Sequence, residues 1–131
     1  MDQRPERLLL IFDGRCGVCT RSVRMLGALD RGHRVLAIPC QRSGAAESVG
    51  LTPEDCESAA WAVAPDGRRY RGAEAVNVAL SVALRTRLPH VLYKLPGIGH
   101  WQDRVYRWVA ANRRRLPGDV AHCSQHPEDC P

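Results

Sequence analysis

The sequence has one lysine, one phenylalanine and no long apolar run. No window approaches the ~18 consecutive apolar residues of a membrane-spanning helix, so we expect no membrane span. The first apolar stretch covers only residues 8–12 and is not followed by a cleavage site of small residues. That length is too short for a secretory signal peptide, so we expect a cytoplasmic protein.

The charge is positive and comes almost entirely from arginine. Lysine and arginine together number 19 and the formal net charge is +5, while Lys94 is the only lysine. This balance permits an anionic partner without requiring one. The few aromatic residues offer no stacking platform for bases, so we do not expect nucleic acid. The run Arg113-Arg114-Arg115 closes a predicted helix, where cations are favoured by the helix dipole.

The hydrophobic pattern predicts one α/β domain. We expect strands at 8–13, 34–40, 60–64 and 68–71 and helices at 16–29, 43–50, 52–58, 73–85, from Pro89 to Leu95 and at 98–115. This order is typical of a thioredoxin-like fold: a central mixed sheet of about four strands, flanked by helices, with extra C-terminal helices. We expect this domain to cover residues 1–117 and residues 118–131 to form a flexible polar tail.

Two of the predicted helices carry apolar stripes. In the first helix, Cys19, Val23, Leu26 and Leu29 share one face at helical spacing. In the last helix, the apolar face consists of Ile98, Trp101, Val105, Trp108 and Val109. Both stripes predict burial against the rest of the domain.

The pair Cys16 and Cys19 stands where the first strand becomes a helix. Two intervening residues place the sulfurs one turn apart, close enough for a disulfide. Unpaired backbone N–H groups and the helix dipole favour a thiolate at the first position. We assign Cys16 as the nucleophile, because it should be the more exposed thiol, and Cys19 as the resolving thiol. Arg15 should lower the pKa of Cys16, and a nearby Asp13 carboxylate should raise it.

Two other interpretations of this pair stay open. The cysteines could simply be small apolar residues in a turn, or they could bind zinc or a cluster. A structural zinc site usually needs four ligands, often as two close pairs, and the sequence has one such pair. The tail residues His122, Cys123, His126 and Cys130 match no zinc spacing, so we expect no metal and no cofactor. We expect Cys40 and Cys56 to be buried small hydrophobic residues.

Three segments carry a family resemblance: FDGRCGVC, PDGRRYRGAEAV and DRVYRWVAANRRRL. Together they resemble the DCC family of predicted thiol-disulfide oxidoreductases, whose Asp-x-x-Cys-x-x-Cys motif stands here as Asp13, Cys16 and Cys19. The resemblance implies a thioredoxin-like fold, a disulfide-containing protein or small thiol as substrate, and an electron donor that it does not identify. The chain differs from thioredoxin in having Val18 where thioredoxin has proline, and it has no proline directly before the third strand.

The sequence therefore supports three hypotheses about function. The first is an enzyme that exchanges dithiol for disulfide through Cys16 and Cys19. The second is a metal- or cluster-binding module in which the tail closes over the cysteine pair. The third is a non-catalytic accessory domain that binds an anionic partner through its arginines.

Overall fold

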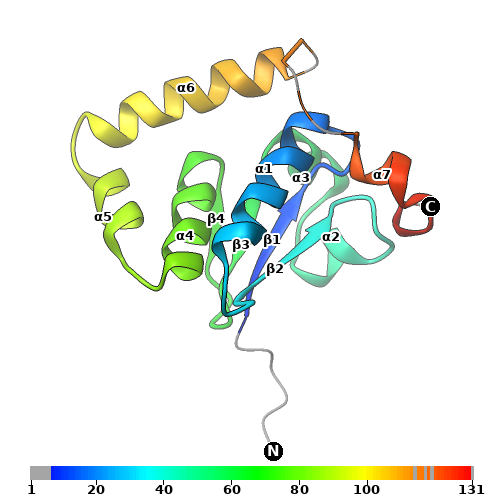
Figure 1. Cartoon of the computed structure of the whole chain (residues 1–131), viewed down its shortest axis with the longest axis horizontal. Helices are drawn as coiled ribbons and strands as arrows, with labels where there is room; N and C mark the ends of the chain where they lie inside the picture. Colours follow the sequence, from blue (N-terminus) through cyan, green and yellow to red (C-terminus); the bar gives the residue numbers. More distant parts are fainter. Residues whose placement is uncertain (1–6, 114, 117, 119, 131) are drawn as a thin grey trace, which may run out of the picture.

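Four strands form the centre of the molecule (Figure 1). The computed structural model describes residues 7–113, 115, 116, 118 and 120–130. The strands lie in the order β2-β1-β3-β4, and their bounds are β1 Leu8–Phe12, β2 Val35–Pro39, β3 Trp61–Val63 and β4 Arg69–Arg71. Strand β1 pairs in parallel with β2 and antiparallel with β3, and β3 pairs antiparallel with β4. This mixed sheet confirms the predicted thioredoxin-like α/β class.

Helices cover both faces of the sheet. Their bounds are α1 Gly17–Leu29, α2 Ala45–Ser48, α3 Pro53–Ser58, α4 Ala73–Leu84, α5 Leu88–Lys94, α6 Ile98–Asn112 and α7 His122–Gln125, followed by a 3-10 turn at Pro127–Asp129. Helices α1 and α4 pack against each other on one face, and α2 and α3 lie on the other. None of the helices in the described part of the chain is long and apolar enough to cross a membrane.

The alternation of side chains along β1 builds both cores. Leu8 and Leu10 point toward α1 and α4 and pack with Ala79 of α4. Ile11 points to the opposite face and packs with Leu51 and Cys56. Because successive side chains of a strand point to opposite faces, one central strand supplies both layers. The parallel neighbour β2 requires a crossover, and α1 provides it.

Cys40 and Cys56 differ from their expected state as free buried thiols. They form a disulfide that joins the residue after β2 to α3, with the two Cα atoms 5.8 Å apart. The sequence indicated that both residues are buried, and both are. Their pairing depends on the position of α3 against β2, which spacing along the chain does not define.

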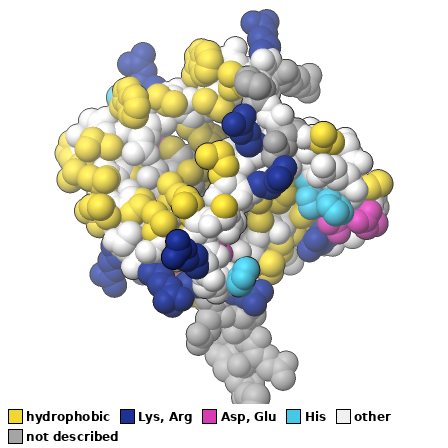
Figure 2. Space-filling view, in the orientation of Figure 1, with side chains coloured by type: hydrophobic (Ala, Val, Ile, Leu, Met, Phe, Trp, Pro, Cys, Tyr) yellow, Lys and Arg dark blue, Asp and Glu magenta, His cyan; other side chains and the backbone are white. Residues whose placement is uncertain are grey.

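Helix α6 is not buried as its apolar stripe predicted. Gly99 is its only buried residue in the described part of the chain, and the side chains of Trp101 and Trp108 are 65% and 58% exposed. The helix packs on α4 and α5 and runs across the top of the molecule in Figure 1. Exposed hydrophobic side chains gather on this side of the surface (Figure 2).

Residues 120–130 also differ from the flexible tail that the sequence suggested. They contain α7 and the 3-10 turn, and a disulfide joins Cys123 to Cys130. Backbone hydrogen bonds attach the start of α7 to the body, since Cys123 N donates to Gly14 O at 2.8 Å and His122 N donates to Thr20 Oγ1 at 3.0 Å. Arg114 and Pro117, which the sequence analysis named, lie outside the described residues.

Candidate active site

The turn between β1 and α1 positions the cysteine pair. Strand β1 ends at Phe12, and Cys16 N donates to Asp13 O at 3.2 Å, which closes the turn. Cys16 is the N-cap residue of α1, and its Sγ accepts a hydrogen bond from Cys19 N at 3.2 Å. Both cysteines are free thiols. The first sulfur thus occupies the place where an N-cap oxygen normally satisfies a helix N–H group.

The exposure of the two cysteines is the reverse of what we expected. Cys16 is buried, with 7% of its surface exposed, whereas Cys19 is half-buried. The C-terminal segment packs on the residues that follow Cys16, because a Cβ atom at Gly118 would lie 2.5 Å from Gly17 C and 2.6 Å from Val18 N. We expected a flexible tail from the polar sequence of residues 118–131, and so this contact was not predicted.

The environment of the pair separates the acidities of the two thiols. The pKa of Cys16 is lowered from 9.0 to about 6, mainly because the Cys19 side chain hydrogen-bonds to it; the Cys19 N–H group and the Arg113 charge add to this effect, while burial and Asp13 oppose it. The pKa of Cys19 is raised by the same side-chain hydrogen bond, by burial and by the charge on Cys16. One thiolate and one thiol at neutral pH are the expected state of the pair.

Arg113 and Asp13 form an ion pair beside the sulfurs. Asp13 Oδ2 lies 3.2 Å from Arg113 Nη1, and its side chain is only 12% exposed. Its other oxygen, Oδ1, accepts hydrogen bonds from Arg15 N at 3.0 Å and from Gln41 Nε2 at 2.8 Å. Three groups therefore hold the carboxylate in place: the guanidinium group of Arg113, the backbone N–H of Arg15 and the side-chain amide of Gln41. The cation that lowers the pKa of Cys16 is Arg113, whereas Arg15, to which the sequence analysis assigned this effect, has an exposed side chain.

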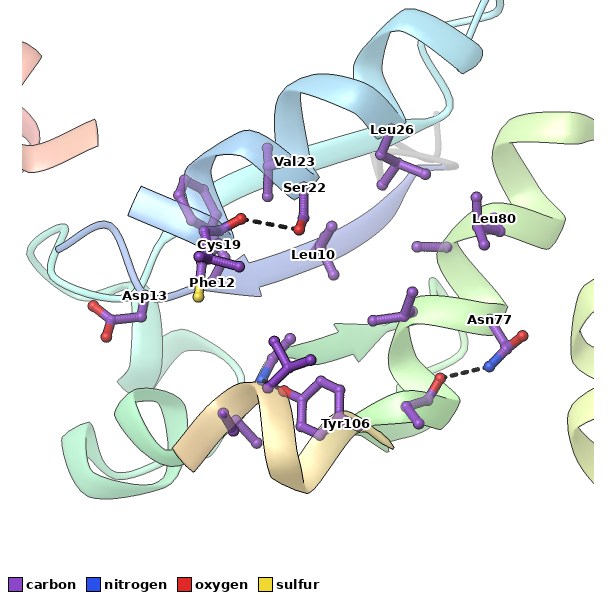
Figure 3. A pocket seen from close by; sticks show the side chains of 18 of the residues that line it. Leu10, Phe12, Asp13, Cys19, Ser22, Val23, Leu26, Asn77, Leu80 and Tyr106 are labelled. Carbon is purple, nitrogen blue, oxygen red and sulfur yellow. Dashed lines mark hydrogen bonds between the residues drawn. The ribbon is translucent and has the colours of Figure 1, made fainter. Parts of the chain in front are cut away.

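Two cavities meet at this ion pair. A polar cavity of about 470 Å³ borders Cys16 and is also lined by Arg15 and Gln41. An apolar cavity of about 490 Å³ borders Cys19, whose sulfur is visible in Figure 3. Asp13 and Arg113 line both cavities. The two sulfurs are thus reached from different sides.

The apolar stripes predicted for α1 and α6 both line the apolar cavity. Residues of α1 and of α6 line it from opposite sides; they are Cys19, Val23, Leu26, Leu29, Trp101, Val105 and Val109. The stripes predicted a contact between buried faces. The structure instead leaves a cleft between them, and for this reason Leu29 and Val105 stay partly exposed.

Sequence reasoning brought Asp13, Cys16 and Cys19 together and missed two partners. Arg113 was named in a basic run at a helix end and belongs to a segment that carries the family resemblance, but no role at the site was predicted for it, and Gln41 was not considered. Arg113 reaches the site because α6 ends beside it. Gln41 follows β2 by two residues, so its nearness to Asp13 depends on the parallel pairing of β1 with β2. The family resemblance, which included Arg113, was the only signal that could have found it.

Tyr106 anchors α6, and hence Arg113, to the sheet. Its hydroxyl accepts a hydrogen bond from Ala60 N at 2.9 Å, just before β3. We expect Tyr106→Phe to lower the free energy of unfolding by about 1–3 kcal/mol, because Ala60 N–H loses its partner in a part-buried place. Urea denaturation measures this change, and Tyr70→Phe is the control, because Tyr70 packs in the core and its hydroxyl forms no hydrogen bond with another described residue. An unchanged stability would contradict the anchoring.

The comparison with protein families gives one match. The family model of the DCC1-like thiol-disulfide oxidoreductases matches residues 10–119. The chain belongs to this family. The matched region contains both cysteines, Asp13 and Arg113. The searches of curated proteins and of solved structures found no match.

The side chains of the described residues do not form a metal-binding group. No group of three or more His, Cys, Asp and Glu side chains lies together there in a way that could hold a metal ion. Cys123 and Cys130, which would have to close over the pair, are joined to each other instead. Cys123 and Cys130 are therefore not free to bind a metal together with Cys16 and Cys19.

Proposed function

We propose that this protein is an enzyme that exchanges dithiol for disulfide through Cys16 and Cys19. The observation that carries the proposal is the pair itself: two free thiols at the start of α1, with Cys19 N donating to Cys16 Sγ at 3.2 Å and a Cys16 pKa of about 6. A thiolate is the attacking species in thiol-disulfide exchange, and an optimal attacking thiol has a pKa near the ambient pH.

The first step is attack by the Cys16 thiolate on one sulfur of a substrate disulfide. A bond forms between Cys16 Sγ and that sulfur, and the second substrate sulfur leaves as a thiolate. Cys19 then loses its proton and attacks Cys16 Sγ, which releases the remaining substrate thiolate. The pair ends as a disulfide and the substrate as two thiols, so two electrons have passed to the substrate. The reverse sequence oxidises a dithiol.

Asp13 and Arg113 have separate roles in this proposal. Arg113 stabilises the Cys16 thiolate and balances the carboxylate, so that Asp13 can lie near the pair with a small effect on Cys16. The second step needs an acceptor for the Cys19 proton, because the pKa of Cys19 is raised. Asp13 lines the cavity that Cys19 borders. We therefore assign it as the proton acceptor for Cys19, as a general base.

The substrate is a disulfide-containing protein or a small disulfide that reaches Cys16 through the polar cavity. Arg15 and Gln41 in its wall can donate hydrogen bonds to carboxylate or amide groups of such a molecule. The electron donor stays unidentified. A cytoplasmic location stays a prediction; there, thioredoxin and glutathione systems keep most thiols reduced, and net reduction of substrates would be the favoured direction.

A redox titration tests the proposed function. We expect Cys16 and Cys19 to interconvert between dithiol and disulfide in glutathione buffers, as measured by differential alkylation and peptide mass spectrometry. The buried pair Cys40–Cys56 serves as the internal control. If Cys16 and Cys19 stay reduced at every ratio, or if the purified protein carries zinc or iron that is lost in Cys16→Ser, the proposal is wrong.

A further inference from the structure

The disulfide of the tail, Cys123–Cys130, lies against the turn that carries the cysteine pair. Cys123 N donates to Gly14 O at 2.8 Å, two residues before Cys16. Helix α7 lies beside the N-terminal end of α1 in Figure 1, and the edge-on contact of the Phe12 and His122 rings supports this packing. The bond Cys123–Cys130 joins two cysteines that are seven positions apart in the sequence. Both of its cysteines are half-buried, so the disulfide is not sealed inside the molecule as Cys40–Cys56 is.

Gln41 connects this disulfide to the cavity that borders Cys16. Its Oε1 atom lies 3.7 Å from Cys123 Sγ and accepts a hydrogen bond from Gly14 N at 2.9 Å. Its Nε2 atom donates to Asp13. Gln41 and Cys16 line the same polar cavity. One side chain therefore contacts the tail sulfur, the turn and the cavity of the nucleophile.

The absence of a side chain at Gly14 permits this close approach. A Cβ atom at this position would lie 2.8 Å from Cys123 Sγ and 2.9 Å from Pro39 Cβ. Separations this short do not occur for real Cβ atoms, so the tail sulfur would have to move away. Glycine is required here by the proximity of the tail.

We propose that Cys123–Cys130 is a second redox centre, which exchanges two electrons with the Cys16–Cys19 pair inside the same chain. This inference rests on the proposed function. The structure holds the pair as two thiols and the tail as a disulfide. The pair is thus the electron donor and the tail disulfide the oxidant, so this exchange needs no other reagent.

The exchange balances within the chain. The Cys16 thiolate attacks Cys123 Sγ, so that the Cys16–Cys123 bond forms, the Cys123–Cys130 bond breaks and Cys130 leaves as a thiolate. Cys19 then attacks Cys16 Sγ, and its proton passes to the departing Cys123 thiolate. The products are the Cys16–Cys19 disulfide, the Cys123 thiol and the Cys130 thiolate. In the forward direction, these steps oxidise the Cys16–Cys19 pair and reduce the tail disulfide. In the reverse direction, the tail dithiol reduces the Cys16–Cys19 disulfide.

A cross-linking experiment identifies the attacked sulfur. The double variant Cys19→Ser, Cys130→Ser retains Cys16 and Cys123 as free thiols. The matched control Cys19→Ser, Cys123→Ser retains Cys16 and Cys130. Both full-length chains are treated with glutathione disulfide and mapped by mass spectrometry. We expect an internal Cys16–Cys123 bond in most chains of the first variant and a Cys16–glutathione adduct in the control. Equal internal cross-linking in both variants would overturn the assignment of Cys123.

The other outcomes separate this inference from the proposed function. If both variants accumulate only the Cys16–glutathione adduct, Cys16 exchanges disulfides but the tail does not take part, and the relay is overturned. If Cys16 takes up no glutathione in either variant, the proposed function fails and the relay fails with it.

A rate measurement tests whether the exchange proceeds in the unmodified site. All six cysteines are retained, and the chain is first oxidised until both pairs are disulfides. One equivalent of a phosphine reductant per chain is then added under argon, and the redistribution of thiols between the two pairs is followed by differential alkylation. We expect Gly14→Ala to slow redistribution about tenfold, which corresponds to ~1.4 kcal/mol in the barrier. Gly27→Ala on α1, where a Cβ atom has nothing within 4 Å, should leave the rate unchanged. Equal rates in the two variants, or no redistribution in the parent chain, would refute the relay.

Discussion

Replacing Cys16 by serine should reduce thiol-disulfide exchange to the uncatalysed background. A serine hydroxyl is not ionised near neutral pH and cannot form a disulfide, so neither the attack nor the intermediate remains possible. The assay is reduction of a model disulfide by the chain under an excess of dithiol. Ser48→Ala is the control, because Ser48 is exposed, its hydroxyl donates to Ala45 O on α2 and the residue lines neither cavity.

Cys19→Ser should behave differently from Cys16→Ser. The first attack remains possible, but no thiol resolves the intermediate, so a mixed disulfide between Cys16 and the substrate should accumulate in stoichiometric amount. Mass spectrometry of the intact chain under non-reducing conditions detects this adduct. If the adduct forms on Cys19 in Cys16→Ser and not on Cys16 in Cys19→Ser, the roles of the two thiols are reversed. That result would agree with the greater exposure of Cys19 rather than with the acidity of Cys16.

The local pattern of the sequence was sufficient to predict the fold. The continuous apolar run of β1, the turn at Pro65-Asp66-Gly67 and the end of the run at Asp13-Gly14 define the strands, and the order of elements then restricts the topology. The turn is the clearest case, because Gly67 has a φ of +92°, a conformation that favours glycine. These features depend on neighbours in the chain, which is why spacing reveals them.

The surroundings of the site depend on contacts between distant segments, and spacing does not reveal them. Arg113 lies a hundred residues from Asp13, and their ion pair requires α6 to end beside the turn. The apolar stripe of α6 predicted burial, which was wrong, because the pattern could not show that the opposing face belongs to a cleft. The tail was taken as loose because its composition is polar, and its disulfide and its hydrogen bonds to Gly14 and Thr20 outweigh composition.

Arg113→Gln should raise the pKa of Cys16 and slow its alkylation at pH 6–7. The thiolate is the reactive form, and Arg113 lowers the pKa of Cys16 by its charge. In the parent chain, the rate of alkylation should rise with a midpoint near pH 6 and level off above pH 7. Without the guanidinium group, that midpoint should move upward by roughly one pH unit. Arg115→Gln removes the same charge at the same end of α6 from an exposed position and is the control.

Asp13→Asn should lower the pH midpoint of Cys16 alkylation, whereas Arg113→Gln should raise it. The carboxylate raises the pKa of Cys16, and it also occupies Arg113, whose charge would act on the thiolate alone after the change. Alkylation of Cys16 should therefore become faster at pH 5–6. Resolution should become slower, because the proposed acceptor for the Cys19 proton is gone, and the mixed disulfide should persist in single-turnover experiments. Faster alkylation with unchanged resolution would show that Asp13 acts on the Cys16 charge alone. A midpoint that stays near pH 6 in both Arg113→Gln and Asp13→Asn would show that the hydrogen bonds from Cys19 control the acidity of Cys16.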